Sequence, residues 1–209
     1  DLLLICDEVQ VGNGRSGKLY GYMHYGVQPD IVSTAKGLAG GLPLGATLLG
    51  GKTAGTLTPS SHGSTFGGSN LAAAAAYATL DTLKTGNFGE RVENRGDYFA
   101  DKLLALDEIT EVRGSGLMIG AVLKDEFKAP FVVDAALDAG FIINATDEHT
   151  LRFLPPLIIE EKDIDKFIAA LPQICIDSKQ KEIEAAEAAK KAEEEADSSS
   201  GMNSDTGSN

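Results

Sequence analysis

Three short apolar runs constrain the fold of this chain more than any other feature of its sequence. They are "LLLIC" at residues 2–6, "IVSTA" at 31–35 and "LGATLLG" at 44–50. Because none of them alternates apolar and polar residues, they predict buried strands of a parallel sheet covered on both faces. Two helices are predicted to follow, at residues 69–86 and 88–108, the second with apolar residues along one face. Strands followed by helices in this way indicate an α/β fold.

A second pattern begins near Asn87. Short apolar strands alternate there with helices, as in a small α+β domain. The predicted elements are "ITEVRG", "GLMIGAVL", a helix from about Pro130 to Ala139, "GFIINA", "TLRFLPP" and a helix from about Glu161 to Leu171. The sequence therefore predicts one domain over residues 1–86 and a second over residues 87–176.

The last segment, residues 177–209, differs in composition from the rest of the chain. It holds four lysines against nine acidic residues and has almost no large apolar side chain after Ile183. We expect a solvated acidic helix followed by a disordered segment at 197–209. At the other end, Asp1 directly precedes a predicted strand, so we expect the chain to be the C-terminal part of a longer protein.

Composition excludes several classes of partner. The formal net charge of −13 disfavours nucleic acid, which needs a basic surface. No apolar stretch is long enough to span a bilayer. The two cysteines, Cys6 and Cys175, lie far apart in the sequence, which fits free thiols in a reducing cytosol better than a disulfide scaffold. We expect a cytoplasmic protein with neither a nucleic-acid nor a membrane partner.

Other kinds of chemistry match the sequence poorly. "GNGRSGKL" (12–19) and "ATLLGGKT" (46–53) approach a phosphate-binding loop, but the first lacks the hydroxyl residue after its lysine and the second lacks the first glycine. The histidines, His24, His62 and His149, show no metal-ligand spacing, so no metal site is predicted. A serine hydrolase would need a G-x-S-x-G elbow, which the sequence lacks.

Asp7 and Lys36 are the best candidates for catalytic chemistry. Asp7 ends the first predicted strand, and Lys36 stands 29 residues later, where "PDIVSTAK" gives way to "GLAGG". A lysine desolvated at a strand end has the lowered pKa that imine chemistry needs, and the glycines leave room for a bulky ring. An acid and an imine-forming lysine at neighbouring strand ends can hold pyridoxal phosphate. The simpler alternative is a capped strand and a surface lysine.

Longer motifs decide between these alternatives. The segment "DEVQVGNGRSGKLYGYMHYGVQPDIVSTAKGLAGGLPLGA" resembles the class III (ornithine-type) aminotransferases, and most closely their acetylornithine type. "HGSTFGGSNLAAAAA" and "LRFLPPLIIEEKDIDKFI" resemble the same family, in the same order. The resemblance covers about residues 1–173 and not the acidic tail. It implies the fold of type I pyridoxal-phosphate-dependent transferases, here the C-terminal part of the large domain followed by the small domain.

The resemblance implies a role for each matching residue. Lys36 matches the catalytic lysine that binds pyridoxal 5'-phosphate covalently, and Asp7 the acid that binds its pyridine nitrogen. Gln10 matches the residue that binds the phenolic oxygen. Val9, placed between them in an extended strand, is expected to pack on the ring. Glu8 and Arg15 are expected to be structural.

Two further segments complete the expected site. Thr65 matches a threonine that reaches the cofactor phosphate of the neighbouring subunit, which implies a homodimer with a shared active site. Ser64 is a weaker candidate for the same phosphate and is counted with the substrate-binding residues. Arg152 matches the arginine that binds the substrate α-carboxylate, and a planar guanidinium suits that grip.

The family implies transfer of the side-chain amino group of N2-acetylornithine to 2-oxoglutarate, in arginine biosynthesis. Ornithine, succinylornithine and 4-aminobutyrate aminotransferases are the alternatives within the family. The family's phosphate-binding loop and ring-stacking aromatic residue match nothing in the chain. We therefore expect residues 1–209 alone to bind the cofactor poorly, and a non-catalytic product is the alternative outside the family.

Overall fold

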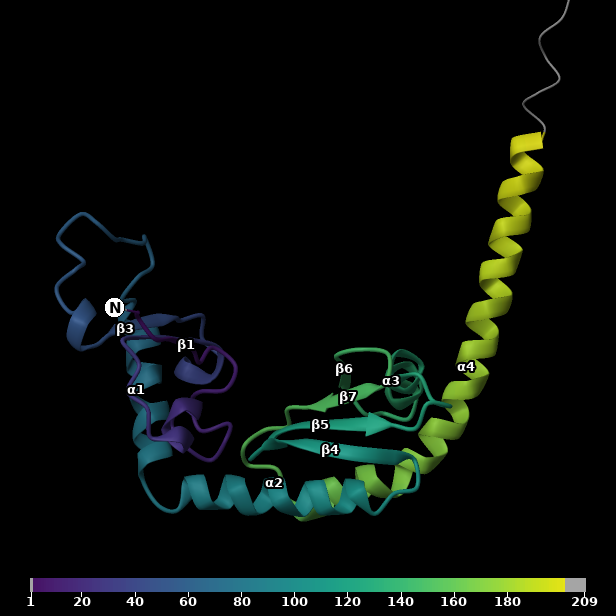
Figure 1. The fold of residues 1–209 in the computed structure, drawn as a ribbon, viewed down its shortest axis with the longest axis horizontal. Helices are drawn as coiled ribbons and strands as arrows, with labels where there is room; N and C mark the ends of the chain where they lie inside the picture. The colour runs from purple at the N-terminus through teal and green to yellow at the C-terminus, as the bar shows by residue number, and fades with distance from the viewer. Residues whose placement is uncertain (1, 202–209) are drawn as a thin grey trace, which may run out of the picture. The chain divides into compact units, whose positions relative to one another are not determined.

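The computed structural model describes residues 2–201, with side-chain burial described to residue 192 (Figure 1). By its internal contacts the chain divides into two compact units. The first comprises Asp1–Lys102, Arg113–Gly120 and Phe153–Ile164, and the second Leu103–Val112, Ala121–Arg152 and Asp165–Asn209. The division predicted at Asn87 stays a proposal.

The first unit holds a three-stranded sheet in the order β1-β2-β3. Its strands are β1 (Ile5–Asp7), β2 (Ile31–Thr34) and β3 (Ala46–Leu49). β1 runs parallel to β2, with Asp7 opposite Ser33, but β3 runs antiparallel to β2. The prediction of an all-parallel sheet is therefore wrong for β3, because the chain returns after the short helix η2 (Lys36–Ala39) without a crossover helix.

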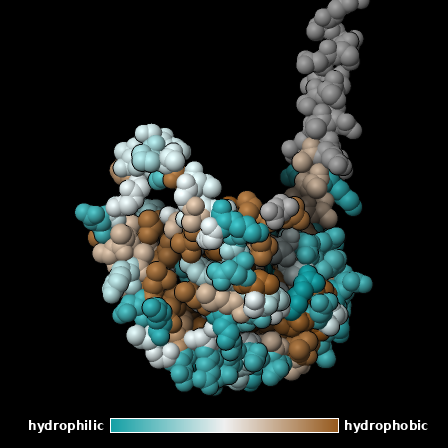
Figure 2. All heavy atoms as spheres, turned by 60° about the vertical axis from the view of Figure 1, so that its left-hand side comes forward, coloured by the Kyte–Doolittle hydropathy of each residue, from teal (hydrophilic) through white to brown (hydrophobic). Residues whose placement is uncertain are grey.

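The predicted burial of residues 2–6 is also wrong. Leu2 is 90% exposed and Ile5 is 61% exposed. β1 is an edge strand with β2 as its one neighbour in the sheet, so few described side chains cover it. Figure 2 shows apolar side chains open to solvent on the face that it presents.

Helix α1 (Asn70–Lys84), which lies beside the sheet in Figure 1, packs against η2. Leu38 and Ala39 of η2 pack against Ala76 of α1, with Leu44 and Leu80 at the edge of the cluster. The unit also contains the short helices η1 (Gly21–Tyr25) and η3 (Gly51–Thr53) and most of α2 (Phe88–Leu104). Packing of η2 on α1 fixes the main chain immediately after Lys36.

A four-stranded sheet in the order β4-β5-β7-β6 forms the rest of the β structure. Its strands are β4 (Ile109–Ser115), β5 (Met118–Leu123), β6 (Asn144–Ala145) and β7 (Thr150–Phe153). β6 pairs antiparallel with β7, placing Asn144 opposite Arg152. A strand was predicted over "GFIINA" (140–145), and its last two residues, Asn144 and Ala145, form β6.

The second unit contains α3 (Ala129–Asp138) and nearly all of α4 (Glu161–Gly201). Within α4 the helix was expected to end near Leu171, yet it continues through Pro172. Proline removes one backbone donor from a helix interior. The buried side chains Phe167 and Leu171 before Pro172 are followed by Ile174 and Cys175 after it, so one apolar face spans the proline. Burial of that apolar face outweighs the free-energy cost of a proline inside the helix.

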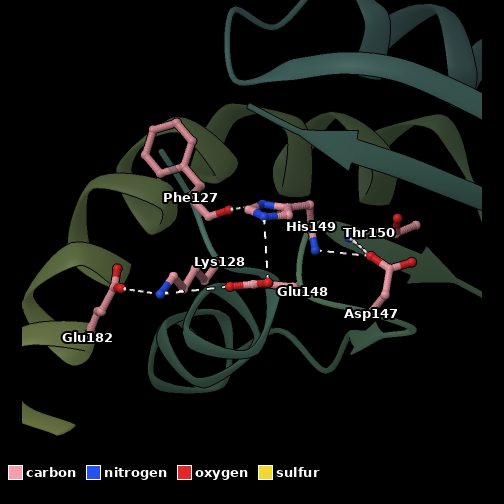
Figure 3. Close-up of polar contacts among 7 residues, drawn as sticks. All are labelled: Phe127, Lys128, Asp147, Glu148, His149, Thr150 and Glu182. Atoms are coloured by element: carbon pink, nitrogen blue, oxygen red, sulfur yellow. Dashed lines mark hydrogen bonds and ion pairs between the residues drawn. The ribbon is translucent and has the colours of Figure 1, made fainter. Parts of the chain in front are cut away.

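Ion pairs hold the next part of α4 on the second unit, as Figure 3 shows in part. Lys128 Nζ lies 2.9 Å from Glu182 Oε1 and 3.8 Å from Glu148 Oε1. Lys179 Nζ lies 2.5 Å from Glu126 Oε2 and 4.6 Å from the centre of the Phe127 ring. Lys181 pairs with Asp138, at the end of α3. Residues 179–182 are thus tethered rather than freely solvated.

The end of the chain differs in part from the prediction. The helix reaches Gly201, so residues 197–201, expected to be disordered, are helical. The rest of that predicted segment, residues 202–209, lies outside the described residues. Within residues 2–201, no helix combines the length and apolar character needed to cross a bilayer.

Candidate functional site

Asp7 and Ser33 lie side by side where the parallel strands β1 and β2 end. Asp7 Oδ1 accepts hydrogen bonds from the Val9 N–H and the Ser33 hydroxyl, each 3.0 Å long. These two bonds hold the pKa of the Asp7 carboxyl below its ordinary value, and the bond from the Val9 N–H has the larger effect. The charge of Lys36 lowers that pKa further. The carboxylate is therefore ionised at neutral pH.

Lys36 follows β2 by two residues and begins η2. Its Nζ donates a 3.0 Å hydrogen bond to Gln10 Oε1. Gln10 belongs to the turn that follows β1, so the ends of both parallel strands deliver groups to one place. Asp7, Gln10 and Lys36, which lie up to 29 residues apart in one predicted motif, come together in this cluster.

The expected burial of Lys36 is wrong for this chain. The Lys36 side chain is exposed, as is Asp7. Lys36 follows a strand end that the described residues leave open, and Gln10 is its hydrogen-bond partner. The argument from a desolvated ammonium therefore does not hold for residues 2–201, and the geometry of the cluster supports Lys36 instead.

Val9 does not lie in a strand, contrary to the prediction. β1 ends at Asp7, and residues 9–16 form turns. The Asp7 side chain binds the Val9 N–H, a local bond by which an aspartate starts a turn. Strand alternation therefore does not set the direction of Val9, which is half-buried.

Ser64 and Thr65 lie in the turn that precedes α1 and are both exposed. The Ser64 carbonyl oxygen accepts a 3.1 Å bond from the Gly67 N–H. Among the described residues, no hydrogen bond links Ser64 or Thr65 to Asp7, Gln10 or Lys36. The structure therefore places this pair outside the lysine cluster of the first unit.

Arg152 belongs to the second unit, in β7. Its Nη2 donates a 3.1 Å bond to Asn144 Oδ1 on β6, which follows from the register of the two strands. Its Nε is buried and has no hydrogen-bond partner among the described residues. The other end of the guanidinium is exposed at its Nη2 bond to Asn144, and a planar guanidinium suits a carboxylate ligand.

Sequence reasoning missed Ser33, whose hydroxyl binds the Asp7 carboxylate. The signal was present: Asp7 ends β1, Ser33 lies one residue before the end of β2, and parallel strands bring matching ends together. Glu8 was expected to be structural, but the groups that it binds were not identified from the sequence. The Glu8 carboxylate is buried and accepts bonds of 2.8 Å from the Gly21 N–H and 2.9 Å from the Tyr22 N–H, which fixes the start of η1.

An acid and a lysine at adjacent strand ends, on an α/β scaffold, match the arrangement expected of a pyridoxal-phosphate-dependent enzyme. Residues 1–175 match the family model of the class-III aminotransferases, and the chain belongs to this family.

Within this family, the chain is similar to aminotransferases named for ornithine and its acylated derivatives. The chain is 46% identical over 178 residues to the acetylornithine aminotransferase of Methanocaldococcus jannaschii, covering 83% of this chain and 44% of that protein. It is 42% identical over 182 residues to the succinylornithine transaminase of Salmonella paratyphi A, covering 82% and 45%. It also matches a solved structure of the ornithine aminotransferase from Toxoplasma gondii, which is reported with partial occupancy of PLP at the active site. That match has a TM-score of 0.75 and 31% sequence identity, and it covers 86% of this chain and 44% of that chain. The chain thus spans less than half the length of these relatives.

Proposed function

We propose that the protein containing this chain is a pyridoxal-phosphate-dependent aminotransferase that moves the side-chain amino group of N2-acetylornithine to 2-oxoglutarate. The observation that carries the proposal is the cluster at the ends of β1 and β2, where Lys36 Nζ lies 3.0 Å from Gln10 Oε1 and its charge acts on Asp7. Relatives named for acetylornithine support the substrate. This reaction would belong to arginine biosynthesis.

The residues of the cluster fit pyridoxal 5'-phosphate. An ionised carboxylate suits a protonated ring nitrogen, a primary amine suits an aldehyde, and the Gln10 amide suits a phenolic oxygen. The lowered pKa of Asp7 supports the first of these pairings, because an ionised Asp7 accepts a hydrogen bond and donates none. When bound, the cofactor supplies an electron sink for the carbon that loses a proton.

Each residue then has a distinct task. Asp7 would hold a proton on the ring nitrogen, and Gln10 and Val9 would orient the ring. Lys36 would hold the cofactor at its aldehyde carbon, and its amine is the group placed to take up and return a proton at the substrate carbon that carries the amino group. A single amine can serve as base and then as acid because proton removal leaves it charged.

Arg152 would bind the α-carboxylate of the substrate through the exposed end of its guanidinium, whose planar shape suits a carboxylate. Thr65, with Ser64 nearby, would serve a cofactor phosphate held by a second copy of the chain. Their exposed turn before α1 leaves both hydroxyls available for this contact. The protein would then be a homodimer with shared active sites.

The remaining proposals concern substrate and location. Ornithine and succinylornithine are the alternative amino donors, because relatives with those names also match the chain; 4-aminobutyrate is a further candidate. The two free cysteines, Cys6 and Cys175, support a reducing compartment, the cytoplasm.

The full-length natural protein that contains this chain provides the test. Amino transfer to 2-oxoglutarate is measured as glutamate formation with each of the four donors. We expect N2-acetylornithine to give the highest kcat/KM, Lys36→Ala to abolish transfer, and Lys52→Ala, a matched exposed lysine of the first unit, to retain it. Equal transfer by Lys36→Ala would overturn the catalytic assignment, and a preference for another donor would overturn the substrate.

A further inference from the structure

Asn13 is a buried polar residue with an unusual backbone conformation. It lies in the turn region after β1, its side chain is 6% exposed, and its φ is +57°. Its Nδ2 group donates two hydrogen bonds, one of 3.1 Å to Thr34 Oγ1 and one of 3.0 Å to the Ala35 carbonyl oxygen. One amide group thus binds the last two residues before Lys36.

The main chain at Lys36 needs such support. Lys36 has a φ of +50°, in the left-handed region that residues with a Cβ rarely adopt. Ala35, just before it, is extended, with a φ of −163° and a ψ of −146°, so the left-handed conformation begins at Lys36 itself. The Ala35 carbonyl oxygen also accepts the Leu38 N–H at 3.0 Å, the bond that closes the first turn of η2. Asn13 and Leu38 therefore share one acceptor.

We infer that Asn13 is a positioning residue for Lys36, an inference that rests on the proposed function of Lys36. The turns after β1 hold this lysine at both ends. Gln10 binds its Nζ at 3.0 Å, and Asn13 binds the carbonyl oxygen of the peptide that precedes it. Because the direction of the Cα–Cβ bond follows from φ and ψ, fixing that peptide sets the direction in which the amine points.

Asparagine suits this position for two separate reasons. It enters the left-handed region more readily than other residues with a Cβ. It also carries two N–H donors on one nitrogen, which match two acceptors. Its Cβ lies 3.6 Å from the position that a Cβ on Gly37 would take, so asparagine and glycine pack closely here. Glycine at position 13 would keep the first property and lose the second.

Two variants separate the amide donor from the backbone conformation. Asn13→Gly keeps the left-handed conformation and removes the amide. Asn13→Asp keeps the shape and replaces the donor nitrogen by an acceptor oxygen. Asn94→Asp on the exposed surface of α2 is the matched control. All are made in the full-length natural protein, and the melting temperature reports whether each variant folds.

The first measurement is hydrogen–deuterium exchange of the Leu38 amide, which requires no cofactor. The second is the amount of phosphopyridoxyl group fixed on Lys36, relative to Lys52, after treatment with pyridoxal phosphate and borohydride at several pH values. Loss of one hydrogen bond at Ala35 is expected to speed exchange about fivefold in both Asn13 variants. The Lys36 to Lys52 labelling ratio is expected to fall by a similar factor, and the Asn94→Asp protein should match the parent in both readouts.

A folded Asn13→Gly protein with parental exchange and parental labelling would overturn the inference. If Asn13→Gly does not fold, Asn13→Asp decides in the same way, because its side chain preserves shape and backbone preference. Absence of preferential labelling at Lys36 in the parent would count against the proposed function, whereas the exchange measurement would still decide whether Asn13 holds the main chain at Lys36.

Discussion

At the scale of single residues, Asp7 shows how hydrogen bonds at a strand end favour the ionised form of a carboxyl group. The Val9 N–H and the Ser33 hydroxyl both bind one carboxylate oxygen, and the pKa of Asp7 lies below its ordinary value as a result. A lowered pKa means that these contacts favour the folded chain above the unfolded pKa of Asp7. That contribution is lost as the pH falls through the lower, folded value. Near neutral pH the group is therefore a stable anion.

Asp7→Asn tests that anion in the full-length natural protein. An amide cannot hold a proton on a ring nitrogen by its charge, so we expect kcat for amino transfer to fall by about a hundredfold or more. The melting temperature at pH 7 should change little, since Asp7 is exposed. Asp97→Asn, an exposed aspartate of α2, is the control and should keep parental kcat. Parental kcat in Asp7→Asn would contradict the role of Asp7.

The two cysteines are expected to differ in reactivity. Cys175 is fully buried in α4, and burial is the main reason that its pKa is raised to about 12. Cys6 is half-buried at the edge strand β1. With iodoacetamide at pH 8, peptide mapping should find Cys6 alkylated and Cys175 protected until denaturant is added, because the thiolate is the nucleophile. In a Cys6→Ser protein, peptide mapping should still find Cys175 unmodified while the protein is folded, and rapid alkylation of Cys175 itself would contradict its burial.

At the scale of elements, α4 is held by packing in its first part and by charge in the next. Phe167, Leu171 and Ile174 are buried, whereas the pairs formed by Lys179, Lys181 and Glu182 lie at the surface. Surface ion pairs weaken as salt screens them. Residues 176–192 should therefore respond to ionic strength, and residues 167–175, which carry no charged side chain, should not.

Hydrogen exchange across α4 checks this expectation. Raising NaCl from about 0.05 M to about 1 M should speed amide exchange in residues 176–192 and leave residues 167–175 unchanged. Lys128→Gln should do the same at low salt, because Lys128 pairs with Glu182 and Glu148. Lys190→Gln, an exposed lysine on the same helix, is the matched control. Equal exchange in both variants at low salt would show that these pairs do not hold the helix.

The same ion pairs determine the pH range over which residues 179–182 are held to the second unit. Hydrogen bonding and charge from Lys179 lower the pKa of Glu126, so its contribution is present above its unfolded pKa and is lost as the pH falls through the folded value. The partner Glu182 raises the pKa of Lys128, so that contribution is present below its unfolded pKa and is lost as the pH rises through the raised value. The slow exchange of residues 176–192 should persist at neutral pH and be lost in strong acid and strong base.

Elements also show what the sequence could predict. The strand ends at Asp7 and before Lys36 were predictable, because an apolar run followed by a polar residue marks the edge of a sheet. The direction of β3 was not, since an apolar run carries no sign for parallel or antiparallel pairing. Nor was the passage of α4 through Pro172, where tertiary packing overrides local propensity. The left-handed backbone at Lys36 and the hydrogen bond from Asn13 to the Ala35 carbonyl oxygen are local features that no periodicity encodes.

At the scale of the whole molecule, the proposed homodimer divides its site between two copies. Asp7, Gln10 and Lys36 form one cluster within one unit of one chain, and Thr65 lies in a separate, exposed turn. If Thr65 of one copy serves the lysine cluster of the other, two inactive variants can complement each other. The lysine cluster itself cannot be complemented in this way, because its members belong to one chain.

Mixing Lys36→Ala with Thr65→Val protein, by unfolding and refolding the two together, tests this division. In a two-fold dimer with random assortment, half of the dimers are mixed, and each mixed dimer keeps one site with both residues intact. About a quarter of the parental amino-transfer activity should therefore return, from parents with little activity of their own. Mixing Lys36→Ala with Asp7→Asn is the control and should restore nothing, since every site then lacks one of the two residues. Mixed dimers, verified by two affinity tags, that stay inactive in the first experiment would place Thr65 in the same subunit's site or outside the site altogether.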